Sequence, residues 1–98
     1  MSLQKIQNQS VRRAILKLLA QAADHSSVDY DLQKAVEIAE GLKPSFENFS
    51  NQLAWLESKG LVLLEGALIN NVIITQQGLD VAEYKIEFGG IAKKRPER

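Results

Sequence analysis

Residues 45–82 read SFENFSNQLAWLESKGLVLLEGALINNVIITQQGLDVA, and three patterns follow one another in them. The first is a spacing of apolar side chains at i, i+3, i+7 and i+10, which predicts a helix with one buried face. Its members are Phe46, Phe49, Leu53 and Leu56. Two runs rich in strand-forming residues, 61–65 and 71–75, then flank a turn that contains Gly66. The segment therefore predicts a helix followed by a β-hairpin, with the start of a further helix behind it.

Local signals mark where these elements begin and end. Pro44 disfavours helical backbone at Lys43, and Ser45 can accept backbone N–H bonds as the N-cap of the helix that follows. Gly60 predicts the end of that helix, and Thr75 is the predicted N-cap of the helix after the hairpin. The inward stripe expected for this last helix consists of Leu79, Ala82 and Ile86.

An earlier helix is predicted between Val11 and Ala22. Its apolar residues recur at i, i+4, i+7, i+8 and i+11, which forms one stripe on an α-helix. The start of this helix has two readings. Either Ser2 caps it, or Ser10 caps it and the first residues form a separate arm.

A second helix is predicted over residues 29–40. Polar residues 24–27 interrupt the helical pattern, Asp29 is placed to act as the N-cap, and Gly41 supplies a left-handed C-cap. Together these elements predict a mainly α protein with a small β-hairpin. The predicted fold is a winged helix-turn-helix, with a three-helix core, a two-stranded wing and a C-terminal helix in residues 1–90. Residues 91–98 are expected to form a basic C-terminal tail.

Length and composition limit the functional classes. A chain of 98 residues has room for one core, and a hydrophobic content of 45% is enough to pack it. The absence of Cys and of any apolar run near ~18 residues predicts a cytoplasmic protein without disulfides or a membrane span. The single histidine, His25, offers no metal-ligand spacing, and no nucleophile is accompanied by an oxyanion hole. We therefore expect no cofactor, no metal and no enzyme activity.

Charge is distributed unevenly although twelve basic and twelve acidic residues cancel. Residues 1–22 carry four basic residues and no acidic one, whereas residues 23–90 carry four basic and eleven acidic residues. Residues 91–98 carry four basic residues against one acidic residue. Because phosphate contacts dominate the affinity for nucleic acids, a neutral chain of this kind must gather its positive charge on one face to bind DNA.

Four blocks of sequence carry a resemblance to a known family. They are 12–19 (RRAILKLL), 53–57 (LAWLE) with 60–62 (GLV), 75–82 (TQQGLDVA) and 94–96 (KRP). The chain resembles the small winged-helix proteins of Mu-like prophages, a branch of the repressor-type winged helix-turn-helix superfamily. The resemblance implies a compact DNA-binding protein and a prophage transcriptional regulator. It also implies arginines on the outer side of the third helix, where this chain has Phe46 and Ser50.

The residues expected to contact double-stranded DNA lie on the third helix and at the basic ends. Amide side chains can bond adenine bidentately in the major groove, so Asn48, Asn51 and Gln52 are candidates to read bases. The other candidates on this side of the fold are Lys43, Ser45 and Ser50. Arg12, Arg13 and the basic tail are candidate phosphate contacts. The alternative is that these groups only form solvated faces of their helices.

Two apolar side chains lie off the buried stripes. Leu16 and Trp55 are candidate contacts with a partner chain. Leu16 could instead face a neighbouring element of the fold, and Trp55 could equally pack against the first helix. A homodimer is expected, because reading a palindrome requires the third helix to be presented twice. A second hypothesis is a protein–protein interaction module without DNA binding, which contacts another phage protein in assembly or packaging.

Overall fold

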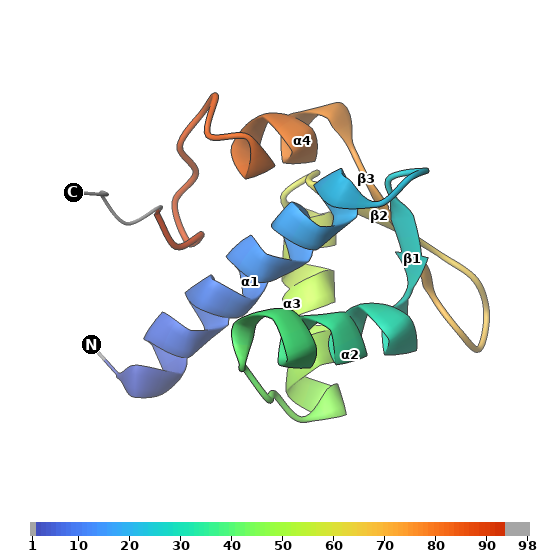
Figure 1. Ribbon diagram of the computed structural model, residues 1–98, viewed down its shortest axis with the longest axis horizontal. Coiled ribbons are helices and arrows are strands. Elements are labelled where there is room, and N and C mark those ends of the chain that lie inside the picture. Colours follow the sequence, from blue (N-terminus) through green and yellow to red (C-terminus); the bar gives the residue numbers. More distant parts are fainter. Residues whose placement is uncertain (1, 94–98) are drawn as a thin grey trace.

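The computed structural model describes residues 2–93, which form four helices and a three-stranded antiparallel sheet (Figure 1). The elements in chain order are α1 (Leu3–Gln21), β1 (Ser26–Val28), α2 (Asp29–Glu40), α3 (Phe46–Ser58), β2 (Val62–Glu65), β3 (Asn71–Ile74) and α4 (Gln76–Ala82). The order of helices, hairpin and final helix confirms the winged helix-turn-helix prediction. α1 crosses the middle of the molecule and packs against α2, α3 and α4.

Helix α1 starts at the first of the two predicted caps. The Ser2 hydroxyl accepts a hydrogen bond from the Lys5 backbone N–H at 3.1 Å, so no separate arm precedes the helix. The side chains that α1 buries are Val11, Ala14, Ile15, Leu16 and Leu19. Its first turns extend past the core, and Leu3 at its start is 84% exposed.

The prediction that Asp29 is the N-cap of α2 is wrong. The N-cap is Val28, which makes no side-chain capping bond, and Asp29 is the first helical residue. Asp29 instead joins α2 to the hairpin. Its backbone N–H donates to the Asn70 carbonyl at 2.9 Å, and its carboxylate accepts from the Asn70 N–H at 3.4 Å. At the other end of α2, Gly41 adopts the predicted left-handed conformation, with φ of 70°.

Helix α3 begins and packs largely as predicted. The Ser45 hydroxyl accepts from the Asn48 backbone N–H at 3.0 Å, and Phe49, Leu53 and Leu56 are buried. Phe46 is the exception to the predicted buried face, because it lies in the first turn, beyond the core. It is 37% exposed and stacks on Tyr30 of α2 with ring centroids 4.9 Å apart.

The sheet has one strand more than the predicted two-stranded wing. Strand β1 pairs with β3, which also pairs with β2, in the order β1-β3-β2. The first strand is only three residues long and contains Ser26 and Ser27, so it carries almost no local strand signal. Its pairing with β3 is what makes it a strand.

The last helix is shorter than predicted. The Thr75 hydroxyl caps it by accepting from the Gly78 N–H at 3.0 Å, but it ends at Ala82. Ile86 therefore lies beyond the helix and is 40% exposed, and Val81 takes its expected place in the core.

Residues 83–93, which we call the C-terminal strap, return along α1 (Figure 1). Ile91 is 4% exposed and belongs to the core, and the Ala92 N–H donates to the Gln9 carbonyl of α1 at 3.2 Å. The packed chain thus continues past the predicted boundary at residue 90. The predicted basic tail falls mostly on residues 94–98, outside the described residues.

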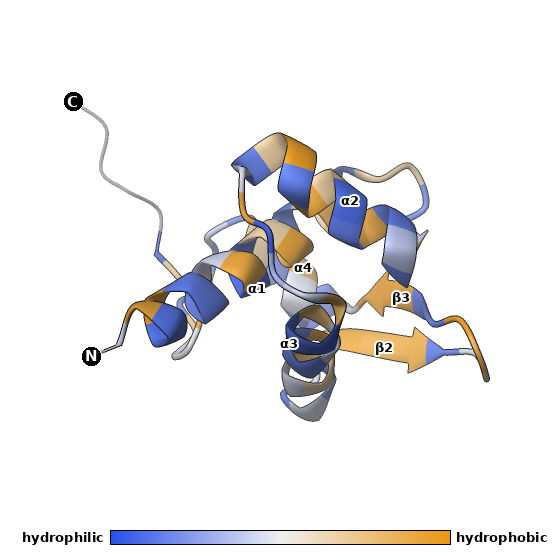
Figure 2. Ribbon diagram, turned by 90° about the horizontal axis from the view of Figure 1, so that it is seen from below, coloured by the Kyte–Doolittle hydropathy of each residue, from blue (hydrophilic) through white to orange (hydrophobic). Residues whose placement is uncertain are grey.

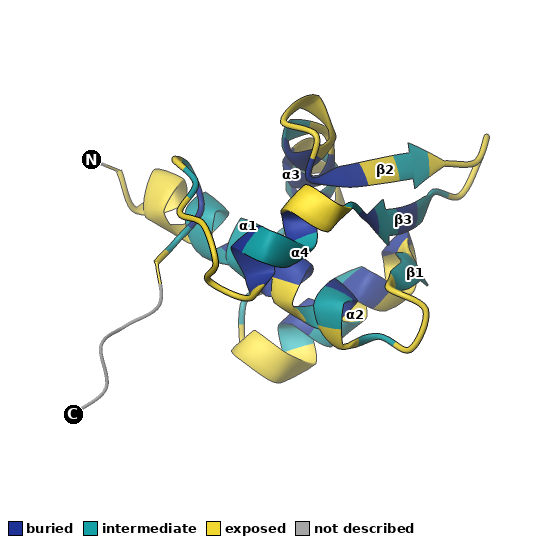
Figure 3. Ribbon diagram, turned by 90° about the horizontal axis from the view of Figure 1, so that it is seen from above, coloured by how far each residue is buried: buried dark blue, intermediate teal, exposed yellow. Residues whose placement is uncertain are grey.

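The core is mainly aliphatic and lies among the four helices and the sheet, where Figure 3 shows buried residues in dark blue. Burial of Val11, Ile15, Leu19, Leu53 and Leu56 joins α1 to α3. Burial of such apolar surface is the main favourable term in folding. Within residues 2–93, no helix is both long and apolar enough to cross a bilayer.

Candidate nucleic-acid interface

An open groove lies where the beginning of α1 meets the beginning of α3. Its volume is about 460 Å³. Lys43, Ser45, Asn48 and Asn51, four of the candidate residues, line this groove together with Glu47. Helix α1 adds Gln4 and Gln7, and Pro44 comes from the turn between α2 and α3. We call this surface the α3 groove.

The groove contains the amino end of the helix that winged-helix proteins insert into DNA. In helix-turn-helix complexes the N-terminal residues of the second motif helix reach base edges, and α3 occupies that position here. Asn51 is exposed, whereas Asn48 and Ser50 are half-buried. The backbone N–H groups of the first turn give this end partial positive charge, and Lys43 adds a full charge. Glu47, also in the first turn, carries a negative charge that offsets part of this positive charge.

The amide side chains along the groove form a continuous hydrogen-bonded series. Gln4 Nε2 donates to Asn8 Oδ1 at 2.9 Å, and Asn48 Nδ2 donates to the same oxygen at 3.1 Å. Gln52 Nε2 then donates to Asn48 Oδ1 at 2.9 Å. The series joins the first turns of α1 to α3 and fixes the orientation of Asn48. Sequence reasoning missed Gln4, Gln7 and Asn8, although their spacing of three and four residues places polar groups on adjacent helical turns.

Gln52 is not available to read bases, which corrects its prediction as a DNA contact. It is 4% exposed, and its Oε1 accepts a hydrogen bond from Arg12 Nε at 2.8 Å. Helical geometry explains the error, because Gln52 lies one turn after Asn48 and beneath α1. Its amide is a buried link between α1 and α3.

Arg12 is likewise bound within the protein rather than open to phosphate. Besides its bond to Gln52, it donates from Nη1 to the Gly90 carbonyl at 2.8 Å. Its guanidinium carbon lies 3.9 Å from the centroid of the Trp55 ring, a cation–π contact. Burial lowers the pKa of Arg12, because desolvation disfavours the charged form.

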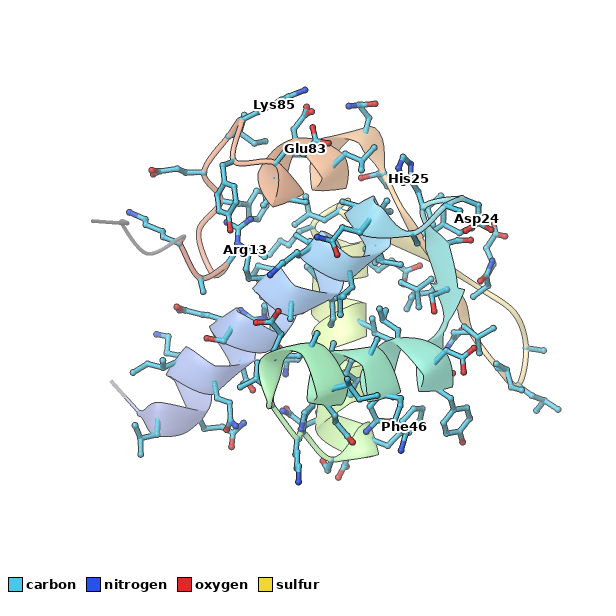
Figure 4. The ribbon with its side chains drawn as sticks, viewed as in Figure 1. Arg13, Asp24, His25, Phe46, Glu83 and Lys85 are labelled. Carbon is cyan, nitrogen blue, oxygen red and sulfur yellow. The ribbon has the colours of Figure 1, made fainter. Side chains whose placement is uncertain are left out.

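Arg13 holds the other part of the strap. It donates from Nε to the Ala92 carbonyl at 2.8 Å and from Nη1 to the Val81 carbonyl at 2.6 Å, and it stacks over Tyr84 at 4.4 Å. Figure 4 shows its side chain directed from α1 toward the segment after α4. Desolvation by burial lowers the pKa of Arg13, and the charge interaction with Tyr84 raises it. Both arginines that were predicted to contact phosphate therefore fasten the strap.

The two predicted partner contacts are also used inside the protomer. Leu16 is fully buried inside the protomer, which agrees with the alternative that it faces a neighbouring element, and the prediction of a partner contact is wrong. Residues four apart share a helix face, but α1 is covered on more than one side by α2, α3 and α4, which buries the off-stripe position. Trp55 packs on Arg12 and makes an edge contact with Phe88, with ring centroids 6.2 Å apart. This agrees with the alternative in which Trp55 packs against the first helix.

The wing, which is the β2–β3 hairpin, has no basic residue. Its loop is apolar instead, with Leu68 98% exposed and Ile69 53% exposed. Figure 2 shows the hydrophobic colouring of β2, β3 and the end of this loop. Glu65 at the end of β2 adds negative charge. The wing is therefore a poor clamp for phosphate.

The remaining chemistry of the site gives no metal position. In residues 2–93, no group of three His, Cys, Asp or Glu side chains is arranged to hold an ion. His25 lies in the turn before β1 with a positive φ of 59°, and its carbonyl accepts from the Ile74 N–H at 3.1 Å. Its role in this geometry is to shape the turn.

The geometry defines a winged helix-turn-helix fold. Comparison with solved structures finds the winged-helix regulator RosR, in the complex structures of hsRosR-S1 and hsRosR-S4. Each superposes with a TM-score of 0.66 at 20% identity and covers 76% of this chain. The chain spans 65% and 64% of the lengths of those two chains, and at this identity the likeness shows the fold alone. Comparisons with protein-family models and with curated proteins found no match.

Proposed function

We propose that this protein binds double-stranded DNA through the α3 groove and acts as a transcription regulator. The observation that carries the proposal is the open amino end of α3, where Lys43, Ser45 and Asn51 lie together on one polar surface. This end is the part of the helix that enters the major groove in helix-turn-helix complexes. The likeness of the fold to RosR supports the same class of function.

The charges of the groove also imply how the proposed complex would behave. Among residues 2–93, Lys43 is the one cation that lines the groove, and Glu47 lines it as well. Each phosphate contact contributes about 0.9 to the slope of log K against log salt, so few contacts give a shallow slope. We therefore expect moderate affinity, with Asn48 and Asn51 contributing base contacts.

Two narrower parts of the proposal concern the biological role and the oligomeric state. The role of a prophage regulator rests on the sequence blocks that resemble Mu-like prophage proteins.

A homodimer would present α3 twice at the spacing of a palindromic site. The apolar side chains available for it at the start of α1 are Leu3 and Ile6, which are 84% and 45% exposed. Light scattering of a Leu3→Glu, Ile6→Glu variant tests this contact, since loss of a dimer is expected and an unchanged mass overturns it.

A second candidate function is a protein–protein interaction module. The specific observation in its favour is the apolar wing loop, because exposed Leu68 and Ile69 replace the charges a phosphate clamp needs. The excess of acidic residues in positions 23–90 also favours a protein partner over DNA. So do Arg12 and Arg13, whose guanidinium groups are hydrogen-bonded within the protomer. Under this function the partner would be another protein. It should co-purify with the unaltered protein and should not co-purify with the Leu68→Ser, Ile69→Ser variant.

Fluorescence anisotropy with labelled duplex DNA tests the first function. Binding at ~50 mM salt that weakens at ~150 mM is expected, as counterion release requires. Lys43→Gln should weaken binding and reduce the salt slope by about one. Lys85→Gln is the matched control, because Lys85 lies beyond α4, far from the groove (Figure 4), and pairs with Glu83 at 3.3 Å. Absence of binding at ~50 mM salt, or equal effects of the two variants, would overturn the proposal.

A further inference from the structure

A second and smaller pocket lies between α1 and the C-terminal strap. Its volume is about 190 Å³. Its lining includes three apolar side chains, Ile86, Phe88 and Ile91, and two cations, Arg13 and Lys93. This strap pocket is separate from the α3 groove, with which it shares no residue.

The positive charge of Arg13 has no acidic partner in the described part of the chain. The ion pairs there are Lys17–Glu40, Lys85–Glu83 and Lys93–Glu87, so no carboxylate lies within 4.0 Å of this guanidinium. Two backbone carbonyls and the Tyr84 ring surround it instead. A guanidinium has five N–H donors, and the carbonyls take two of them. Because a desolvated cation without a counter-charge is costly, an anion in the pocket would stabilise it.

Lys93 supplies a second positive charge at the rim of the pocket. Its ammonium lies 3.8 Å from Glu87, and the side chains are 77% and 83% exposed, so this ion pair is weak. Glu87 also lines the pocket and would repel a ligand of high negative charge. The balance of one arginine and one lysine against one carboxylate favours a monoanion over a phosphate dianion.

The size and the apolar part of the lining define the rest of the ligand. A cavity of about 150 Å³ lined by apolar side chains can hold benzene, whereas drug-sized ligands occupy about 300–1,000 Å³. A pocket of about 190 Å³ therefore fits a body of one ring or one branched chain. Ile86 is 40% exposed, and a ligand that covers it would remove apolar surface from water.

We propose that the strap pocket binds a small organic monocarboxylate of about the size of benzoate. The carboxylate would bond to Arg13 and approach Lys93, and the apolar body would lie against Ile86 and Phe88. Such a ligand would contact α1 and the strap at once and so strengthen the attachment of residues 83–93. Because it binds only the folded arrangement, it would raise the stability of the protein. The proposal does not depend on DNA binding.

The test is a titration of the ¹⁵N-labelled protein, without DNA, with benzoate and phenylacetate. Saturable shifts of the Phe88, Ile91 and Ala92 amides are expected, with none at Asn51. Benzyl alcohol has the same ring without the charge, and its affinity should be about ten- to a hundredfold lower, since hydrogen bonds to charged groups contribute about 1.5–3 kcal/mol.

Variants with added negative charge test whether benzoate binds in the strap pocket. Ile86→Asp and Lys93→Glu change exposed side chains and add negative charge, so both should weaken benzoate at least about tenfold while the protein stays folded. Lys85→Gln, outside the pocket, should bind as the unaltered protein does. The proposal is overturned if no amide shift saturates below ~10 mM benzoate, or if benzyl alcohol binds with the same affinity as benzoate. It is also overturned if both Ile86→Asp and Lys93→Glu bind benzoate as tightly as the unaltered protein does. None of these results bears on the α3 groove.

Discussion

The two ends of α3 contrast in how their polar groups are used. At its amino end, Lys43, Ser45 and Asn51 line an open groove with their side chains turned to solvent. Along its second half, Gln52 and Trp55 are covered by Arg12 and the strap. At the covered end, Arg12 donates to the Gly90 backbone carbonyl, whereas Lys43 in the groove makes no such bond within residues 2–93. Substitutions at the covered end should therefore change stability, and substitutions at the open end should change binding.

The largest expected effect is at Gly90, where the strap crosses Trp55. Its φ of +91° disfavours other residues, and an added Cβ would lie 2.6 Å from the Trp55 ring. Gly90→Ala should lower the free energy of unfolding by about 2–3 kcal/mol in urea titrations, from strain and overpacking. Gly89→Ala is the matched control, because nothing lies within 4 Å of its added Cβ. Equal stability of the two variants would contradict a tightly held strap.

The next effect is expected at Arg12. Arg12→Ala leaves the Oε1 of buried Gln52 and the Gly90 carbonyl without a donor, which should cost about 1–3 kcal/mol. Arg12→Lys keeps the charge but lacks the planar fork, so it should restore only part of the stability. If thermal unfolding of Arg12→Ala matched the unaltered protein while DNA affinity fell, Arg12 would belong to the binding surface instead.

A smaller effect on stability is expected at Ser45, where the contribution to helix capping can be measured separately from the contribution to DNA binding. Ser45→Ala removes the cap bond to the Asn48 N–H and should cost about 1 kcal/mol. Ser45→Asp keeps a capping oxygen, so the unfolding midpoint should recover. Its added negative charge in the groove should nevertheless weaken DNA binding in the anisotropy assay. Recovery of both properties in Ser45→Asp would place DNA away from this end of α3.

The smallest effect on stability is expected at Asn51. This exposed amide has no hydrogen-bond partner among residues 2–93, so Asn51→Ala should leave the free energy of unfolding within about 0.5 kcal/mol. Loss of one good base contact should cost about 1–3 kcal/mol of binding, measured as about a ten- to hundredfold rise in Kd. A Kd that does not move would show that α3 does not read bases through this residue.

Local signals predicted most of the fold. Caps at Ser45 and Thr75, the left-handed Gly41 and the helical apolar stripes depend on neighbouring residues. The structure has both caps, the Gly41 conformation and the stripes except for Phe46 and Ile86. Strand β1 could not be predicted, because Ser26–Val28 becomes a strand only by pairing with β3. The role of Asp29 could not be predicted either, because its hydrogen-bond partner Asn70 lies about forty residues away in the chain.

The site was harder to predict than the fold, because charge in a sequence does not reveal its partners. Arg12 and Arg13 read as phosphate contacts until the carbonyls of Gly90, Ala92 and Val81 are placed beside them. Those carbonyls lie 68 to 79 residues away, Val81 at the end of α4 and the other two on the strap, which has no regular secondary structure. The groove residues were easier to predict, since capping and helical periodicity place Ser45 and Asn51 from nearby sequence alone.

The most direct test of the contrast between the two ends of α3 is an NMR titration of the ¹⁵N-labelled protein with duplex DNA at low salt. We expect the largest amide shifts at residues 43–51 and 4–8, with small shifts along the wing and the strap. Shifts confined to the wing loop or to residues 83–93, with residues 43–51 unchanged, would contradict the assignment of the α3 groove as the DNA-binding surface.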